Sequence, residues 1–297
     1  MPLNELSEAQ VEQFMEKGWV KLEQAYSVEA ALAAKAYVWS QVEKRGVRRD
    51  DPSTWTQPIL RMNENYDTPE FRACQTERLR GAIEDLIGAG QWAFRDRPIY
   101  WGWWPVNFHL GADKPWDVPT EAWHIDGIHH PQYIDSPEQG LLLLCLFSDI
   151  RERGGGTLVV EGSHRIVARI LRDHPEGLAV KDVNELAKRH PYLAELTGRA
   201  PLPDGASRIE RFMNRDTVDE TGVRLRVVET TGGPGDVIIG HPFLFHAASQ
   251  NHSGIPRFMC NNQAPLKEKI KLRRQAGDTH TPLERSILRA IGAEPAG

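Results

Sequence analysis

The sequence predicts a mainly β fold, a sandwich or barrel with flanking helices. After Pro98, short β-like segments follow one another and are separated by Gly, Pro and Asp. About eight such segments are typical of a sandwich or barrel. The first hundred residues show helical spacing instead. The expected strands are 99–109, 123–126, 141–147, 157–160, 225–228, 237–239, 243–247 and 256–262.

The composition is that of an ordinary globular protein. Of 297 residues, 40% are hydrophobic, which is enough for a sizeable core, and the net charge is -5. No basic field is available for nucleic acid or an acidic membrane, so we expect neither as a partner. The start lacks a signal peptide, and the three cysteines have no C-x-x-C spacing. We therefore expect a cytoplasmic protein with buried thiols, whose oligomeric state no motif predicts.

The N-terminal part, about 1–97, is expected to be mainly helical. Ser7 is an N-cap with Gln10 three positions on, and Gly18 ends that helix. A short strand is expected at 19–22 and a second helix at 27–44. Segment 50–67 is polar and contains proline, so we expect a loop there.

The β core should occupy about 98–264 of a single domain, interrupted by a charged, helix-prone insert at about 166–223. An insert of that length is a candidate lid or substrate-selecting element. A last helix, about 281–291, begins with a capping box, because Thr281 precedes Pro282 and Glu284. We expect this helix to cover the outside of the barrel.

A candidate metal site begins in the segment Trp123-His124-Ile125-Asp126-Gly127. The two-residue period of a strand places the imidazole of His124 and the carboxylate of Asp126 on one face. Downstream, another expected strand ends in His246. Two histidines and one carboxylate on one face of a metal suit non-haem iron(II), while zinc also accepts these ligands.

Arg257 adds a second, independent signal. It lies on the strand after His246, beyond the turn 250–254, and shares one strand face with Met259, Asn261 and Gln263. A guanidinium that points into a barrel can bind a carboxylate of a dicarboxylic acid in a bidentate manner. An unpaired buried arginine would be costly, so an anionic ligand is expected.

With these residues in place, the chain resembles the phytanoyl-CoA dioxygenase-like branch of the iron(II)- and 2-oxoglutarate-dependent oxygenases. The likeness covers most of the chain. The segments that carry it are Phe-Met-Glu-Lys-Gly-Trp-Val at 14–20, the His124-x-Asp126 pair, Gly-Gly-Gly-Thr-Leu-Val-Val-Glu-Gly-Ser-His-Arg at 154–165, 235–246, and 251–257. The resemblance implies a double-stranded β-helix (a jelly-roll, cupin-like core), iron(II) bound by His124, Asp126 and His246, and 2-oxoglutarate that chelates the metal with its far carboxylate on Arg257.

The resemblance also implies weaker assignments around the co-substrate. In relatives a polar residue on the strand before the His-x-Asp segment often contacts 2-oxoglutarate, and Asn107 has the comparable place. Relatives often carry a hydroxyl two positions after the distal histidine, where this chain has Ala248, so Thr157 or Ser249 is the expected substitute.

Other residues near the motif have a functional and a structural interpretation. His129 and His130 are candidate substrate contacts, but surface loop histidines explain them as well, and Trp123 could stack on substrate or pack in the core. His241 lies five residues before His246, on the opposite face of a regular strand, and is expected to pack.

The sequence therefore predicts an oxygenase that uses iron(II), 2-oxoglutarate and O2 to hydroxylate a small metabolite or natural-product intermediate, releasing succinate and CO2. Related halogenases are implied to lack the carboxylate ligand, so Asp126 favours hydroxylation or another oxidation. Two alternatives are a metal-dependent hydrolase or isomerase without 2-oxoglutarate and a non-catalytic ligand-binding barrel. Arg257 argues against the hydrolase, which has no evident need for that residue.

Overall fold

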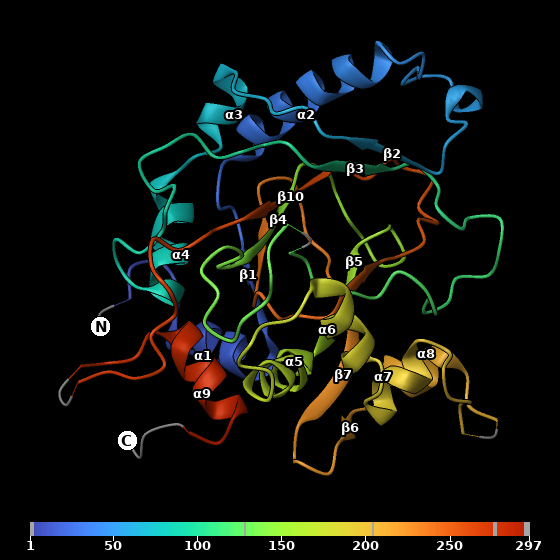
Figure 1. The fold of residues 1–297 in the computed structure, drawn as a ribbon. Helices are drawn as coiled ribbons and strands as arrows, with labels where there is room; N and C mark the ends of the chain where they lie inside the picture. Colours follow the sequence, from blue (N-terminus) through green and yellow to red (C-terminus); the bar gives the residue numbers. More distant parts are fainter. Residues whose placement is uncertain (1–2, 128, 204, 276–277, 294–297) are drawn as a thin grey trace.

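Two four-stranded antiparallel sheets form the centre of the molecule in the computed structural model, which describes residues 3–127, 129–203, 205–275 and 278–293 (Figure 1). The first sheet has the order β1-β8-β4-β10 and the second β6-β7-β5-β9. The first comprises β1 (Trp19–Leu22), β8 (Val237–Gly240), β4 (Leu142–Leu146) and β10 (Met259–Gln263). The second comprises β6 (Thr217–Val218), β7 (Arg224–Glu229), β5 (Thr157–Glu161) and β9 (His246–Ala248). These paired sheets confirm the expected jelly-roll core with flanking helices.

A third pair of strands corrects one prediction. Segment 50–67 was expected to be a loop, but it contains the 3-10 turn η1 (Pro52–Thr54) and β2 (Ile59–Met62), which pairs with β3 (Trp104–Asn107). The prolines and polar residues hid a four-residue strand whose partner lies more than forty residues downstream, as the register Ile59↔Asn107 shows. Asn107 in turn bridges Arg257, so the pair lies beside β10.

Several expected strands are shorter than predicted. Segment 99–109 contributes only β3, and 243–247 contributes only the start of β9. Segment 123–126 is not a regular strand, because only His124 makes a bridge, to His246. The loop preceding this segment, which includes Ala122 at φ 65, is irregular and does not extend the pairing.

The helices cover the outside of the sheets. The predicted caps are confirmed: Ser7 and Thr281 each form a capping box, and Gly18 ends the first helix with φ 85. The helices of the N-terminal part are α1 (Glu8–Lys17), α2 (Val28–Glu43), α3 (Pro69–Ala73) and α4 (Glu77–Ile87). The last helix is α9 (Pro282–Ala290), which lies beside α1 (Figure 1). No helix among the described residues is long and apolar enough to cross a bilayer.

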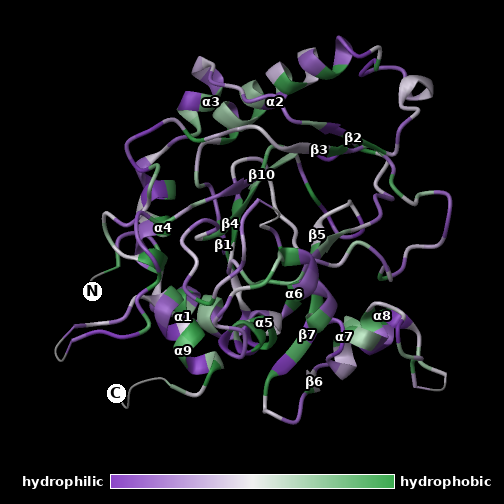
Figure 2. Ribbon diagram, in the orientation of Figure 1, coloured by the Kyte–Doolittle hydropathy of each residue, from purple (hydrophilic) through white to green (hydrophobic). Residues whose placement is uncertain are grey.

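Both faces of the first sheet are buried, and they belong to two separate hydrophobic clusters. Leu141, Leu143 and Cys145 belong to the main core with the helices, whereas Leu142 and Leu144 belong to a smaller cluster on the other face. The smaller cluster consists of Leu142, Leu144, Leu146, Ile150, Ile238 and Met259, with Trp19 against it. This second face looks into the barrel. Helices α1 and α9 show both apolar and polar residues, as expected for helices with one buried side (Figure 2).

All three cysteines are free and buried, as expected. Cys145 and Cys260 lie directly opposite each other in the β4–β10 register. Burial raises the pKa of the Cys260 thiol to about 12, so the thiol stays protonated and behaves as a small core side chain.

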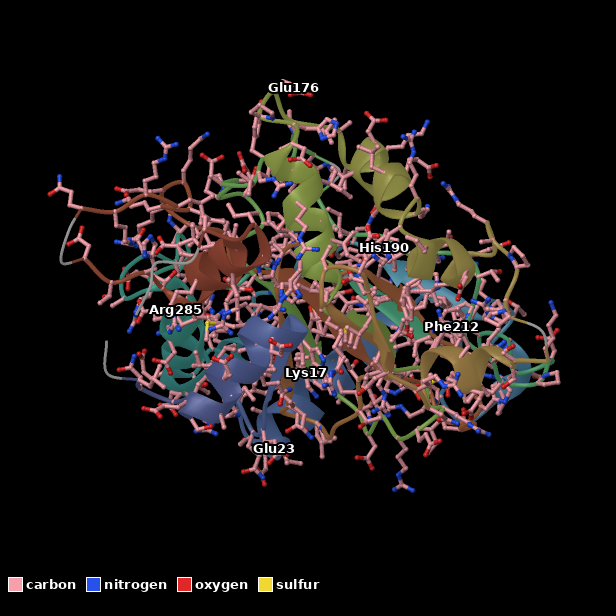
Figure 3. The ribbon with its side chains drawn as sticks, turned by 90° about the horizontal axis from the view of Figure 1, so that it is seen from below. Lys17, Glu23, Glu176, His190, Phe212 and Arg285 are labelled. Atoms are coloured by element: carbon pink, nitrogen blue, oxygen red, sulfur yellow. The ribbon has the colours of Figure 1, made fainter. Side chains whose placement is uncertain are left out.

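The chain between β5 and β7, here called the insert, is mainly helical. Its helices are α5 (Ser163–Arg172), α6 (Val180–Ala187), α7 (Pro191–Leu196) and α8 (Arg208–Phe212), followed by β6. Seen from below, His190 and Phe212 of the insert lie to the right, Arg285 of α9 lies to the left, and Glu176 lies at the top between them (Figure 3). Arg208 fastens the insert to the loop before the metal segment by donating to the carbonyl oxygens of Val118 and Pro119.

Candidate metal centre and co-substrate site

The two candidate histidine ligands are direct backbone partners. The amide of His124 donates to the carbonyl oxygen of His246 at 3.0 Å, and the amide of His246 donates back at 2.9 Å. This reciprocal pair places both imidazoles on the same face, with ring centroids 4.5 Å apart. Residues 122 positions apart in sequence thereby form two corners of one site.

Asp126 completes the triad. Its Oδ1 lies 3.4 Å from Nε2 of His124 and 3.8 Å from Nε2 of His246. One ligand atom from each of the three residues lies within 4.8 Å of the others. Among the described residues, this is the group of three or more His, Cys, Asp or Glu side chains that fits a metal ion.

The tautomers of both histidines follow from their partners. Nδ1 of His124 lies 2.7 Å from the carbonyl oxygen of Ala122, and Nδ1 of His246 lies 3.0 Å from that of Leu244. A carbonyl can only accept, so each Nδ1 carries a proton and each Nε2 is the atom that faces Asp126 and is left to bind a metal. This orientation is the one that metal-binding histidines need.

The carboxylate is held in its charged form. Burial raises the pKa of Asp126. The neighbouring His246 and His124 and a hydrogen bond from Asn261 lower it by more, so the net pKa is well below its usual range. Nδ2 of Asn261 donates to Oδ2 of Asp126 at 3.2 Å, on the side away from the histidines. A metal ion at this position would be held by Nε2 of each imidazole and by an ionised carboxylate, a donor set that fits iron(II).

Arg257 is a buried cation without an acidic partner. It is 3% exposed, its Nη2 donates to the carbonyl oxygen of Pro105 at 2.9 Å, and its Nε has no hydrogen-bond partner. Burial lowers its pKa to about 10, although Glu229 opposes the shift. No ion pair among the described residues includes it. A buried guanidinium with no ion pair and a free Nε fits a bound carboxylate.

Asn107 lies beside Arg257 but is already engaged. The two residues exchange backbone hydrogen bonds at 2.8 and 3.1 Å. The Asn107 side chain donates to the carbonyl oxygen of Ser249 and accepts from the amide of Leu110. Its contact with the co-substrate stays a prediction. In the structure, its side chain is hydrogen-bonded to the loop after β9.

Of the two predicted hydroxyl substitutes, Thr157 has the better place. It lies directly opposite Ala248 in the β5–β9 register, two residues from the pair Val159↔His246, and so shares the face of His246. Ser249 instead donates to Oε1 of Glu229. The co-substrate contact of Thr157 stays a prediction.

The three candidate substrate contacts are spread over different environments. Trp123 is 2% exposed, stacks on Phe245 and donates to the carbonyl oxygen of Pro119, so packing accounts for it. His130 contacts Gln132 within its own loop, and His129 is exposed. None of the three has an observed contact with the triad, and their substrate roles stay predictions.

Two polar residues at the site were not singled out from the sequence. Asn261 had been placed on the inward face of its strand, but its contact with Asp126 depends on a loop 135 positions away. Asn184, in the insert, accepts a hydrogen bond from the amide of Ile125 at 2.8 Å. No local pattern marks either residue, because both contacts come from tertiary structure.

Comparison with known proteins supplies the family. The family model described as phytanoyl-CoA dioxygenase (PhyH) matches residues 103–259, more than half of the chain and all three triad residues. The chain belongs to the phytanoyl-CoA dioxygenase family. It is accordingly an iron(II)- and 2-oxoglutarate-dependent oxygenase, and its cofactors are iron(II), 2-oxoglutarate and O2. No curated protein matches the chain.

Solved structures are similar over most of the length. AviO1 from Streptomyces viridochromogenes Tue57 is 16% identical, covers 95% of this chain and 100% of its own, and gives a TM-score of 0.42. HygX from Streptomyces hygroscopicus, with nickel and 2-oxoglutarate bound, is 15% identical over 86% and 85%, with a TM-score of 0.44. EctD from S. alaskensis, with 2-oxoglutarate and 5-hydroxyectoine, is 17% identical over 87% and 76%, with a TM-score of 0.46.

Proposed function

We propose that this family member hydroxylates a small molecule, with His124, Asp126 and His246 as the iron(II) ligands and Arg257 as the 2-oxoglutarate anchor. The observation that carries the proposal is Arg257. Its guanidinium is buried and has no ion-pair partner among the described residues, so a dicarboxylate bound at the metal triad would supply the missing anion.

The protein contributes by positioning the metal ligands and by shielding the reaction from water. The backbone pair His124–His246 and the carbonyl partners of both Nδ1 atoms fix the imidazoles before metal binds. When bound together, iron(II), 2-oxoglutarate and O2 supply the oxidising power that hydroxylates a C–H bond and releases succinate and CO2. Asp126 occupies the third ligand position, which favours hydroxylation over halogenation.

The barrel wall keeps that reaction away from water. The inward side of the first sheet is aliphatic, with Leu142, Leu144, Leu146 and Ile238 each 2% exposed or less. By contrast, the side chain of His124 is 44% exposed, so the metal position is open on the His124 side. Substrate would approach there, next to the insert, and we propose a small metabolite or natural-product intermediate in the cytoplasm.

The test is oxygen-triggered turnover of 2-oxoglutarate. Purified protein is mixed anaerobically with iron(II) and 2-oxoglutarate, the metal-to-ligand charge-transfer band is recorded, and succinate is measured after oxygen is admitted. We expect the band only when iron(II) and 2-oxoglutarate are both present. We expect succinate only when oxygen is present as well. Wild-type protein with neither band nor succinate would refute the proposal and favour a hydrolase, an isomerase or a binding protein.

A further inference from the structure

The metal-ligand segment pairs with β9 through a single bridge, His124 with His246, and no strand pairs with its other side among the described residues. In an extended chain, successive amides point to opposite sides. The amide of His124 points to His246 on β9, so the amide of Ile125 points away from the sheet. A strand on that side would normally accept this hydrogen bond, and a buried amide without an acceptor would be destabilising.

The insert provides the missing acceptor. Oδ1 of Asn184 on α6 accepts from the amide of Ile125 at 2.8 Å, across 59 positions of sequence. Helix α6 packs against α5, and its Val183 and Ala187 are 0% exposed. The side chain of Asn184 therefore accepts the hydrogen bond that a neighbouring strand would otherwise accept from Ile125.

The position of this hydrogen bond matters because Ile125 lies between two ligands. Its side chain is 1% exposed and points to the opposite face from His124 and Asp126. The Ile125 amide belongs to the peptide plane that joins His124 to Ile125, so its hydrogen bond orients that plane and the backbone that continues to Asp126. Without the acceptor, rotation of the segment would move the imidazole and the carboxylate relative to each other.

We propose that Asn184 is a positioning residue of the metal centre, so that the insert forms part of the metal site as well as its substrate side. The inference rests on the proposed metal ligands. Outer partners of metal ligands typically change metal affinity by about 10- to 100-fold when removed. The same contact gives the insert a direct mechanical link to the ligands, because α6 cannot shift without changing the Ile125 hydrogen bond.

The experiment measures Co(II) binding and the Co(II) d–d absorption spectrum of the whole protein. Asn184→Leu keeps the size of the side chain and removes the acceptor, and we expect about tenfold weaker Co(II) binding with a changed spectrum. Asn184→Asp restores an acceptor and should bind within about threefold of wild type. Asn184→Ser is a milder variant, too short to reach Ile125, for use if the leucine variant does not fold.

Two controls separate positioning from general stability. Val183→Ala removes buried contacts of the same helix but leaves the acceptor, so it should lower the melting temperature without changing Co(II) affinity or spectrum. Lys181→Ala changes an exposed residue of α6 and should alter neither.

The outcomes are distinct. If wild type binds Co(II), and the leucine or serine variant binds it equally well with the same spectrum, the role of Asn184 is overturned and the proposed function stands. If Val183→Ala weakens binding as much as the leucine variant, the effect is one of stability, which also overturns it. If wild type does not bind Co(II), or if His124→Ala binds it as well as wild type, the assigned metal site itself fails.

Discussion

Two pairs of histidines lie at nearly the same separation in this protein, yet they are chemically different. His124 and His246 have ring centroids 4.5 Å apart, and His164 and His241 have centroids 4.8 Å apart. The first pair has Asp126 within 4 Å of both rings. The second pair is 0% exposed, and no carboxylate forms an ion pair with it among the described residues.

Hydrogen bonding explains the second pair. Nε2 of His164 lies 3.2 Å from the carbonyl oxygen of Met15 and must donate, whereas Nδ1 of His241 accepts from the amide of Phe243 at 3.1 Å. Nδ1 of His164 is thus an acceptor and Nε2 of His241 a donor, and neither has a partner. Burial keeps both rings neutral. The two pairs therefore differ in where their free ring nitrogens point: both Nε2 atoms of the first pair face one carboxylate, whereas the free nitrogens of the second pair face none.

The largest expected effect comes from removing that carboxylate. Asp126→Ala leaves two neutral imidazoles, which is the state of the His164–His241 pair. We expect metal affinity to fall by more than about 100-fold, beyond the range of outer-partner changes. Calorimetric titration with Co(II) measures it, with His164→Gln as the control that should keep wild-type affinity. An Asp126→Ala protein that binds Co(II) normally would contradict the distinction between the pairs.

Next in size is the loss of the co-substrate anchor. Arg257→Leu removes charge-assisted hydrogen bonds worth about 1.5–3 kcal/mol each, so we expect 2-oxoglutarate affinity to fall by about 100-fold. Co(II) affinity should not change, because Arg257 is not one of the triad. Titration of the Co(II)-loaded protein with 2-oxoglutarate measures the effect. Equal affinity in both proteins would remove Arg257 from the site.

The second histidine pair should make the protein sensitive to acid. Burial, and then the charge of Arg165, lower the pKa of His164 to about 3 in the folded state, against about 6.5 in an unfolded chain. Between these values the unfolded chain binds the extra proton, so the free energy of unfolding falls as pH falls, by up to about 1.4 kcal/mol per pH unit. Urea unfolding of His164→Gln between pH 6 and 4 should show a shallower slope than wild type. Parallel slopes would mean that His164 is protonated in the folded protein.

The smallest effect concerns the loop that orients the first pair. Ala122 has φ 65, a left-handed conformation, and its carbonyl oxygen accepts the hydrogen bond from His124. A β-branched residue is strained there, so Ala122→Val should destabilise the protein by about 1–2 kcal/mol, whereas Ala122→Gly should change stability by less than about 1 kcal/mol. Thermal unfolding compares the two, and equal stability of both variants would show that the loop adapts freely.

The sequence predicted the features that depend on local residue patterns or on the order of motifs along the chain, namely the helix caps and the metal triad. The capping boxes at Ser7 and Thr281 are local, and both were found. The His-x-Asp spacing and the family resemblance placed His124, Asp126 and His246 together. Asn184 escaped prediction because nothing near it in sequence distinguishes it from other polar helix residues. Strand β2 escaped because its pairing with β3 is non-local.

The proposed metal and co-substrate sites can be located by anomalous diffraction at the iron edge, from crystals grown anaerobically with iron(II) and 2-oxoglutarate. We expect one strong peak among Nε2 of His124, Nε2 of His246 and the Asp126 carboxylate, with density for a dicarboxylate that reaches Arg257. A peak at the His164–His241 pair, or a filled triad with no ligand at Arg257, would contradict the proposed sites.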